Sequence, residues 1–253
     1  EGPVETLEFT DDGRGLVSGG VDRTVRTWDL GSGRSEVHAG FEGIVSEVQP
    51  LADGRSILAV STSGEVRLFE PHRAGQVVGE HDAPATGLAV AIDDRVASID
   101  EQGQLRIAEL TGALIAEHAT PPARMIHLVA APDGRSFAGV PRAWVTMTDG
   151  RRPDRAAPPA TLLLGTFDAS PPRRILLPSA ALELAWLGDD VIVALVDGSV
   201  LRVDRSGAMT ELDRFTGPAT SVAVAPDGAW IAAGSEDGAV RLSEPATGRR
   251  RAR

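Results

Sequence analysis

Short runs of alternating apolar and polar residues recur along the whole chain, and polar corners separate them. The runs VETLEFT (4–10), IVSEVQP (44–50) and TGLAVAI (86–92) place an apolar residue at nearly every second position. This alternation is typical of β-strands that bury one side, whereas an amphipathic helix would space its apolar residues three or four apart. The pattern therefore predicts many short strands.

An acidic corner follows each of these first runs at nearly constant spacing. It contains an Asp, in most copies followed by Gly, and its Asp residues are Asp12, Asp53, Asp93, Asp133, Asp189 and Asp227. The steps between them are 41, 40, 40, 56 and 38 residues, so one interval is stretched. Asp-Gly suits a tight corner because both residues tolerate positive φ and the carboxylate can accept hydrogen bonds from the backbone that follows.

Three further runs follow each corner in most copies. The second runs include GLVSGG, SILAVS and VIVALV, the third include TVRTWD, EVRLFE and AVRLSE, and the fourth include GQVVGE, ALIAEH and RRILLP. A helix could contest only ALELAWL (181–187), and the position of this run in the repeat favours a strand. Four strands per copy in six copies predict an all-β fold, a β-propeller of four-stranded antiparallel blades.

Two segments carry a resemblance to a known family. SGGVDRTVRTWD (18–29) followed by LGSGR, and VAVAPDGAWIAAGSEDGAVRLSEPATGR (222–249), resemble WD40 repeats of the kind common in large bacterial multidomain proteins. The resemblance implies a single WD40-type propeller domain over residues 1–253, excised from a longer chain. The intact ring would then have six or seven blades.

In the WD40 family a His, a Ser or Thr, a turn Asp and a Trp form a structural network in each blade. The first copy has Ser18, Asp22 and Trp28 at these positions, and the His position falls just before the first residue. A buried indole N–H needs an acceptor, and the turn Asp can satisfy backbone donors. We expect Trp28, Trp186 and Trp230 to lie in the core.

The other copies depart from this network. The third copy retains His81 and Ser98 but has Gln102 where the turn Asp would lie. The second and sixth copies have Phe41 and Phe215 at the His position, so we expect these blades to rely on apolar packing instead.

The sequence does not decide how the ring closes. The last copy ends in ATGRRRAR (246–253), and a run of Arg is a poor final strand. Either RRRAR pairs weakly as a final strand, or further blades lie outside this chain. An open blade edge would favour self-association.

The stretched interval contains an insertion, residues 142–159. If TLLLGTFD (161–168) is the third strand of the fourth copy, the insertion is a hairpin between the second and third strands, on the face that usually meets partners. If WVTMTD (144–149) is the third strand, the insertion moves to the opposite face. We favour the first register because it restores the spacing to the next corner.

The insertion also contains the candidate binding residues. They combine an aromatic side chain with several guanidinium groups and are Arg142, Trp144, Arg151, Arg152 and Arg155. This combination is typical of interface hot spots. Alternatively, Trp144 only covers its own hairpin and the Arg residues keep a Pro-rich loop soluble.

Composition narrows the class of partner. The formal net charge is -11, and residues 1–120 contain 21 acidic residues against 9 Arg, whereas residues 121–253 contain 15 against 16. This acidic first part would repel a phosphate backbone, so nucleic acid is a disfavoured partner. The chain has no Cys and no long apolar run, which excludes disulfides and indicates no membrane span, and we expect a cytoplasmic protein.

No convincing catalytic or metal-binding pattern is present in the sequence. The five His residues, which are His38, His72, His81, His118 and His127, show no metal-ligand spacing, and no Gly-rich loop leads into a helix. The turn Asp residues have a structural role that needs no metal. We therefore expect no cofactor and no enzyme activity.

Together these features predict a non-catalytic scaffold that docks a protein partner through loops on one face of the propeller. The resemblance implies a larger bacterial signalling or defence protein, with an NTPase, kinase or protease-like companion domain. The alternative is a propeller enzyme, or a binder of a metal or small ligand, that uses the central channel.

Overall fold

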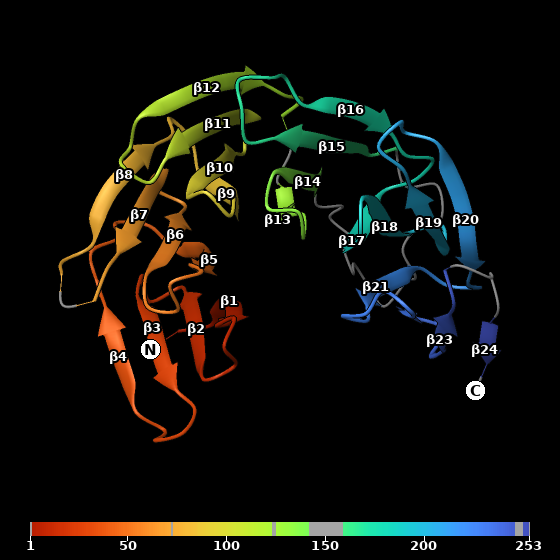
Figure 1. The fold of residues 1–253 in the computed structure, drawn as a ribbon, viewed down its shortest axis with the longest axis horizontal. Coiled ribbons are helices and arrows are strands. Elements are labelled where there is room, and N and C mark those ends of the chain that lie inside the picture. Colours follow the sequence, from red (N-terminus) through yellow and green to blue (C-terminus); the bar gives the residue numbers. More distant parts are fainter. Residues whose placement is uncertain (1, 72, 123–124, 142–158, 246–249, 253) are drawn as a thin grey trace. The chain divides into compact units, whose positions relative to one another are not determined.

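The structure of the chain is a computed structural model, which describes residues 2–71, 73–122, 125–141, 159–245 and 250–252 (Figure 1). The described residues are all-β, and their strands form six four-stranded sheets. We call each sheet a blade. In the part of the chain that the structure describes, no helix has the length and apolar character needed to cross a membrane.

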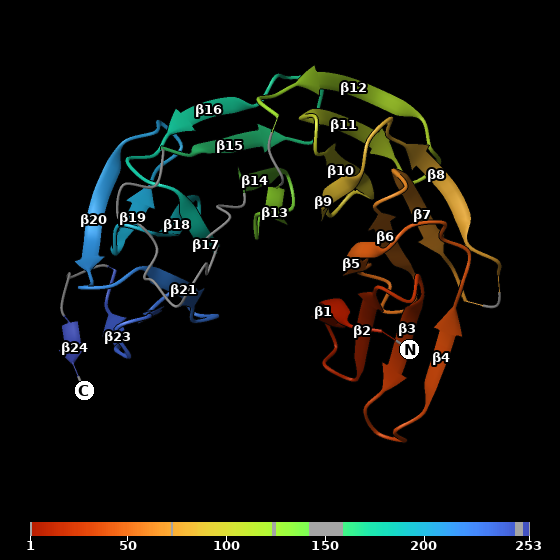
Figure 2. The ribbon, with the colours of Figure 1, turned by 180° about the vertical axis from the view of Figure 1, so that it is seen from behind.

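The chain divides into two compact units, Glu1–Ala130 with Thr166–Pro171, and Ala131–Gly165 with Pro172–Arg253. The first unit contains the first three blades, whose strands pair in chain order (Figure 2). The strands are β1 (Val4–Phe9), β2 (Gly15–Gly20), β3 (Val25–Asp29) and β4 (Ser35–His38); β5 (Val45–Pro50), β6 (Ile57–Ser61), β7 (Glu65–Phe69) and β8 (Gln76–Glu80); and β9 (Ala85–Val90), β10 (Arg95–Asp100), β11 (Gln104–Glu109) and β12 (Leu114–Ala119).

The remaining three blades follow the same order. Their strands are β13 (Met125–Ala130), β14 (Ser136–Pro141), β15 (Thr161–Thr166) and β16 (Arg173–Leu176); β17 (Ala181–Leu187), β18 (Asp190–Leu195), β19 (Ser199–Val203) and β20 (Met209–Arg214); and β21 (Ala219–Val224), β22 (Ile231–Ser235), β23 (Val240–Ser243) and β24 (Arg250–Ala252). The prediction of an all-β fold made of four-stranded blades is confirmed.

Particular strand assignments are also confirmed. The run ALELAWL forms strand β17 rather than a helix. The third strand of the fourth blade is β15, in agreement with the register that takes TLLLGTFD as this strand. Residues 250–252 form β24, which pairs with β23.

The corners between the first and second strands of the blades are held by their Asp side chains. Asp12 Oδ1 accepts a hydrogen bond from the Arg14 N–H at 2.9 Å, and Asp53 Oδ1 accepts one from the Arg55 N–H at 2.9 Å. Gly13 lies between Asp12 and Arg14 in the first corner and has a φ of 65°. A residue with a side chain would be strained in this backbone conformation. Because the carboxylate replaces missing backbone partners, each corner is fixed by its own sequence.

The hydrophobic core lies between neighbouring blades. Val17 and Val25 of the first blade pack in one cluster with Val48, Ile57 and Phe69 of the second, and all five side chains are buried. Equivalent clusters join the second blade to the third and the fifth to the sixth. Because the sheets in these three pairs bury apolar side chains against each other, none of them is expected to be stable alone.

The first blade has the expected bond between Trp28 and Ser18, but Trp28 is not a core residue. The Trp28 Nε1–H donates to Ser18 Oγ at 3.0 Å, whereas Asp22 binds Thr24 and Arg26 of its own hairpin. Trp28 is 36% exposed because no blade covers its face of the sheet in the described part of the chain. The expectation of a buried Trp28 was therefore wrong, and Trp186 and Trp230 are only half-buried.

The third blade has Gln102 at the position of the turn Asp, and Asp100 takes over the role of that Asp. Buried Asp100 accepts hydrogen bonds at Oδ1 from the N–H groups of Gln102 and Gln104, each at 2.9 Å, while its Oδ2 lies 3.5 Å from His81 Nδ1. His81 Nε2 is 2.8 Å from Ser98 Oγ. Burial lowers the pKa of His81, and the Asp100 carboxylate opposes that shift.

The expectation that the second and sixth blades rely on apolar packing in place of the His was incomplete. The Arg67 guanidinium lies 5.5 Å from the centroid of the Phe41 ring, and the Arg241 guanidinium lies 4.5 Å from the Phe215 ring. Arg241 Nη1 also donates to buried Asp213 at 2.7 Å. In both blades a Phe ring therefore takes the place of the imidazole, and a guanidinium from the third strand stacks on that ring.

Candidate binding cavity between the first two blades

The binding residues predicted from the insertion, which are Arg142, Trp144, Arg151, Arg152 and Arg155, lie outside the described residues. The described chain ends at Pro141, the last residue of β14, and resumes at Pro159, shortly before β15. The insertion thus connects the second and third strands of the fourth blade, and its role stays a prediction.

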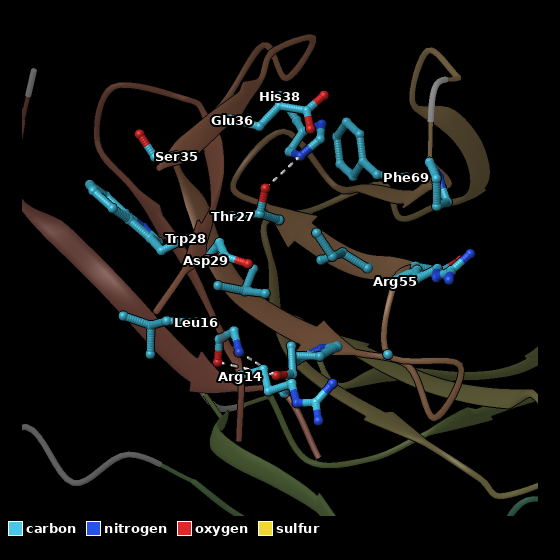
Figure 3. Close-up of a pocket in the computed structure, with 18 of the residues that line it drawn as sticks. Arg14, Leu16, Thr27, Trp28, Asp29, Ser35, Glu36, His38, Arg55 and Phe69 are labelled. Carbon is cyan, nitrogen blue, oxygen red and sulfur yellow. Dashed lines mark hydrogen bonds between the residues drawn. The ribbon is translucent and has the colours of Figure 1, made fainter. Parts of the chain in front are cut away.

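The largest cavity described within the first unit lies between the first and second blades (Figure 3). Its volume is about 570 Å³, within the usual range of ligand sites. Turns from four hairpins surround it, namely β1–β2, β3–β4, β5–β6 and β7–β8. The sequence analysis did not predict this cavity.

Side chains from both blades form the cavity floor. Thr27 Oγ1 of β3 lies 3.3 Å from His38 Nε2 of β4, and the His38 ring packs on buried Phe69 of β7 with 5.5 Å between ring centroids (Figure 3). Buried Val17 and Ile57 also line the cavity, so its floor is mainly apolar.

The position of Phe69 depends on a glycine. A Cβ atom added to Gly75, just before β8, would lie 2.4 Å from Phe69 Cε1 and 2.8 Å from Cδ1. Only hydrogen at this position lets the ring lie flat against the β7–β8 loop. The floor of the cavity is therefore specified by a small residue as well as by the ring.

Three arginines with no partner surround the cavity. Arg14, Arg34 and Arg55 are exposed residues of three different turns, and their guanidinium groups make no ion pair or hydrogen bond with any residue that the structure describes. Figure 3 shows Arg14 and Arg55 on the turns of adjacent blades. Three cationic groups are thus available to a ligand.

The acidic residues of the cavity are mostly engaged already. Asp12 accepts from Thr10 and the Arg14 N–H, and these hydrogen bonds hold the pKa of Asp12 below its ordinary value. Asp29 accepts from the Ser32 hydroxyl and N–H, which lowers its pKa in the same way.

Two further carboxylates line the cavity. Glu70 pairs with Arg73 at 2.7 Å, so it too is engaged. Glu36 has no partner among the described residues. The unpaired groups of the cavity are therefore three guanidinium groups and one carboxylate.

In the second unit an arginine bridges the corner turns of two adjacent blades, at the place equivalent to this cavity. There Arg205 Nη2 lies 2.7 Å from Asp133 and 2.7 Å from Asp189, and so ties the corner turns of the fourth and fifth blades together. Arg205 is the second residue after β19, and the second residue after β7 is Pro71, which cannot make such a bridge. The opening between the first two blades thus follows from the sequence.

A signal for this site exists in the sequence. The corners TDDGR and LADGR place Arg14 and Arg55 at equivalent positions, 41 residues apart. Residues at equivalent positions of adjacent blades come side by side, and so the repeat period brings these two arginines to the same end of the unit. The contribution of Arg34 could not be found in this way, since it depends on how the β3–β4 turn approaches the next blade.

Within the described residues, no group of three or more His, Asp or Glu side chains is placed to hold a metal ion. His38 and His81 lie in separate blades and bond to different hydroxyl groups. His38 and His81 are therefore accounted for by structural contacts.

Comparison with known proteins defines the class. The sequence matches the WD40 family (WD domain, G-beta repeat) at residues 1–29 and 209–242. The fold is similar to the crystal structure of the computationally designed Ika8 protein, with a TM-score of 0.75 and 19% sequence identity, over 98% of this chain and 73% of that chain. The two matched segments and the six repeated four-stranded blades are consistent with a WD40-like propeller. WD40 domains are generally protein-interaction scaffolds and are typically non-catalytic.

Proposed function

We propose that the chain is a protein-interaction scaffold that holds a segment of a partner protein in the cavity between its first two blades. The observation that carries the proposal is the cavity itself, with an apolar floor of fixed geometry and exposed cationic groups around it. Such a combination gives an apolar side chain a place to bind and orients the polar groups beside it. The WD40 fold supports the same role.

Two elements of the proposal rest on the sequence alone. The insertion of residues 142–159 would supply a second contact with the partner through Trp144, and Trp144→Ala should abolish capture of the partner while leaving the melting temperature nearly unchanged. A cytoplasmic location within a larger bacterial signalling or defence protein is proposed on the resemblance.

Site-specific photo-crosslinking tests the docking site. A photoreactive amino acid replaces Ser35, an exposed residue of the cavity, and in a control protein it replaces Gln102, an exposed residue of the third blade. We expect the Ser35 position to give a discrete crosslinked partner in extracts of the native cell, and unlabelled protein to compete for it. The same products from both positions, or none from Ser35, would contradict the proposal.

Self-association is a second candidate role, and an exposed apolar face favours it. Phe9, Leu16 and Trp28 are cross-strand neighbours on one face of the first blade. Phe9 is 64% exposed, and Leu7 on the same face is 53% exposed. Apolar groups of this size on one sheet face are typical of interaction surfaces.

Sedimentation velocity over a concentration series tests this second role. We expect the mean mass to rise with concentration, and Phe9→Asp to suppress the rise. The matched control is Ile92→Asp, because Ile92 is 74% exposed on a turn of the third blade. A constant monomer mass, or equal effects of both substitutions, would remove this role.

A further inference from the structure

Most of the described arginine side chains form an ion pair, a hydrogen bond or a ring contact, but a few do not. Among the arginine side chains that the structure describes, four make no ion pair, hydrogen bond or ring contact, and they are Arg14, Arg34, Arg55 and Arg135. Three of these four line the cavity between the first two blades. In a chain with a net charge of -11, guanidinium groups without a carboxylate partner are the exception.

Resting on the proposed function, we infer that the segment held in this cavity is acidic, and that its carboxylates pair with Arg14, Arg34 and Arg55. Guanidinium groups are strong and geometrically selective partners of carboxylates, because two parallel N–H groups match the two oxygens. Since the three side chains come from three turns on two blades, one compact anion cannot satisfy them all as well as an extended segment with several carboxylates.

The cavity carboxylates Asp12 and Asp29 stay charged, and they attract Arg14 and Arg34, respectively. Among the described residues, neither guanidinium forms an ion pair or hydrogen bond with its Asp. Asp12 and Asp29 direct an oxygen to hydrogen bonds within their own turns, and Glu70 is paired with Arg73. Glu36 is left as the one lining carboxylate without a described partner. The N–H groups of the three guanidinium groups are therefore free to bind the carboxylates of a ligand directly.

The apolar floor indicates a second property of the segment. Phe69 and Ile57 are buried beneath the cavity and give its floor an apolar surface. A leucine or phenylalanine between the acidic residues of the segment would match this surface.

A nucleic acid is a poorer fit than a peptide. The first 120 residues contain 21 acidic residues against 9 Arg, so a long phosphate backbone would meet repulsion outside the cavity. A short acidic peptide places its charges only where the arginines lie.

Fluorescence anisotropy tests the inference on the full chain. The probe is a short labelled peptide in which glutamate alternates with leucine or phenylalanine, and the control peptide has glutamine in place of glutamate. We expect the glutamate peptide to bind more tightly, and its affinity to fall as salt increases. Each of Arg14→Gln, Arg34→Gln and Arg55→Gln should weaken binding by about two- to fivefold, and the triple variant by at least about tenfold.

The matched control variant is Arg135→Gln, because Arg135 follows the same Asp-Gly corner and is also unpaired but does not line the cavity. Its affinity should equal that of the unchanged protein. Equal binding of both peptides, equal loss in Arg135→Gln, or equally effective competition by inorganic triphosphate or a single-stranded oligonucleotide would overturn the inference.

The two proposals can fail separately. If the partner crosslinked at Ser35 still binds the triple Arg variant with unchanged affinity, the acidic character of the segment is wrong while docking in the cavity stands. If Ser35 gives no specific crosslink, docking in the cavity itself is wrong.

Discussion

The cavity floor depends on the contact between Phe69 and Gly75, and the substitution Gly75→Ala perturbs this contact directly. The added Cβ would lie 2.4 Å from Phe69 Cε1, whereas carbon atoms in contact are normally more than 3.4 Å apart. Gly75 does not have a positive φ, so the alanine introduces no backbone strain. The expected loss of unfolding free energy is therefore steric and amounts to about 1–3 kcal/mol.

A double-mutant cycle isolates this steric term. Phe69 is 2% exposed, and Phe69→Ala should cost about 3–5 kcal/mol on its own. In the Phe69→Ala background the ring atoms that Gly75→Ala meets are gone, and the further cost of the alanine should fall to about 0.5 kcal/mol or less. Urea unfolding followed by circular dichroism and by tryptophan fluorescence measures each free energy.

Gly79→Ala in β8 is the matched control. Its added Cβ would meet only Val66 at 3.6 Å, an ordinary contact distance, so it should show no coupling to Phe69. If Gly75→Ala costs the same in the presence and absence of the Phe69 ring, the contact is not what fixes the cavity floor, and the reasoning is refuted.

Two further predictions concern titratable groups. Burial, together with the nearby Glu8 carboxylate, raises the pKa of Glu47 in the folded protein well above its ordinary value of 4.5. As the pH rises above 4.5, the unfolded chain therefore loses the Glu47 proton more readily than the folded protein, and the folded protein loses stability. Glu47→Gln keeps an oxygen for the Leu88 N–H and should raise the melting temperature at neutral pH by a few degrees, with the gain disappearing near pH 4.5; no gain at neutral pH would contradict this. Asp100→Asn should destabilise the third blade by about 1–2 kcal/mol and lower the pKa of His81 further, which an NMR titration of the His81 ring protons measures; an unchanged pKa would show that Asp100 does not act on His81.

Much of the fold could be predicted because the same pattern of strands and corners recurs in six copies. The corner Asp residues recur at nearly constant spacing apart from one stretched interval, and four of them, Asp12, Asp53, Asp133 and Asp227, accept hydrogen bonds from the backbone that follows. The assignment of residues 181–187 as a strand came from its place in the repeat, against its helical propensity. Local rules were sufficient wherever the contacts are local.

The remainder depends on contacts that the repeat pattern does not specify. Asp100 lies two residues before the position where the family pattern places a turn Asp, so it was missed. The repeat pattern also did not indicate that Arg67 and Arg241 stack on the rings of Phe41 and Phe215. These pairs join residues 26 positions apart, and no short sequence window contains both members.

The cavity could not be predicted for the same reason. Arg14, Arg34 and Arg55 come from three separate turns, and only packing of two blades brings them around one opening. Their lack of partners is a property of the folded chain, since acidic residues lie close to each of them in the sequence. The sequence directed attention to the insertion because the insertion breaks the period.

The most direct test of the central claim is an NMR titration of the arginine Nε–Hε signals with the acidic peptide, assigned by the single Arg variants. Our account predicts that the signals of Arg14, Arg34 and Arg55 shift together and saturate, while that of Arg135 stays in place. Unchanged signals for these three side chains at saturating peptide, or an equal shift of Arg135, would contradict it.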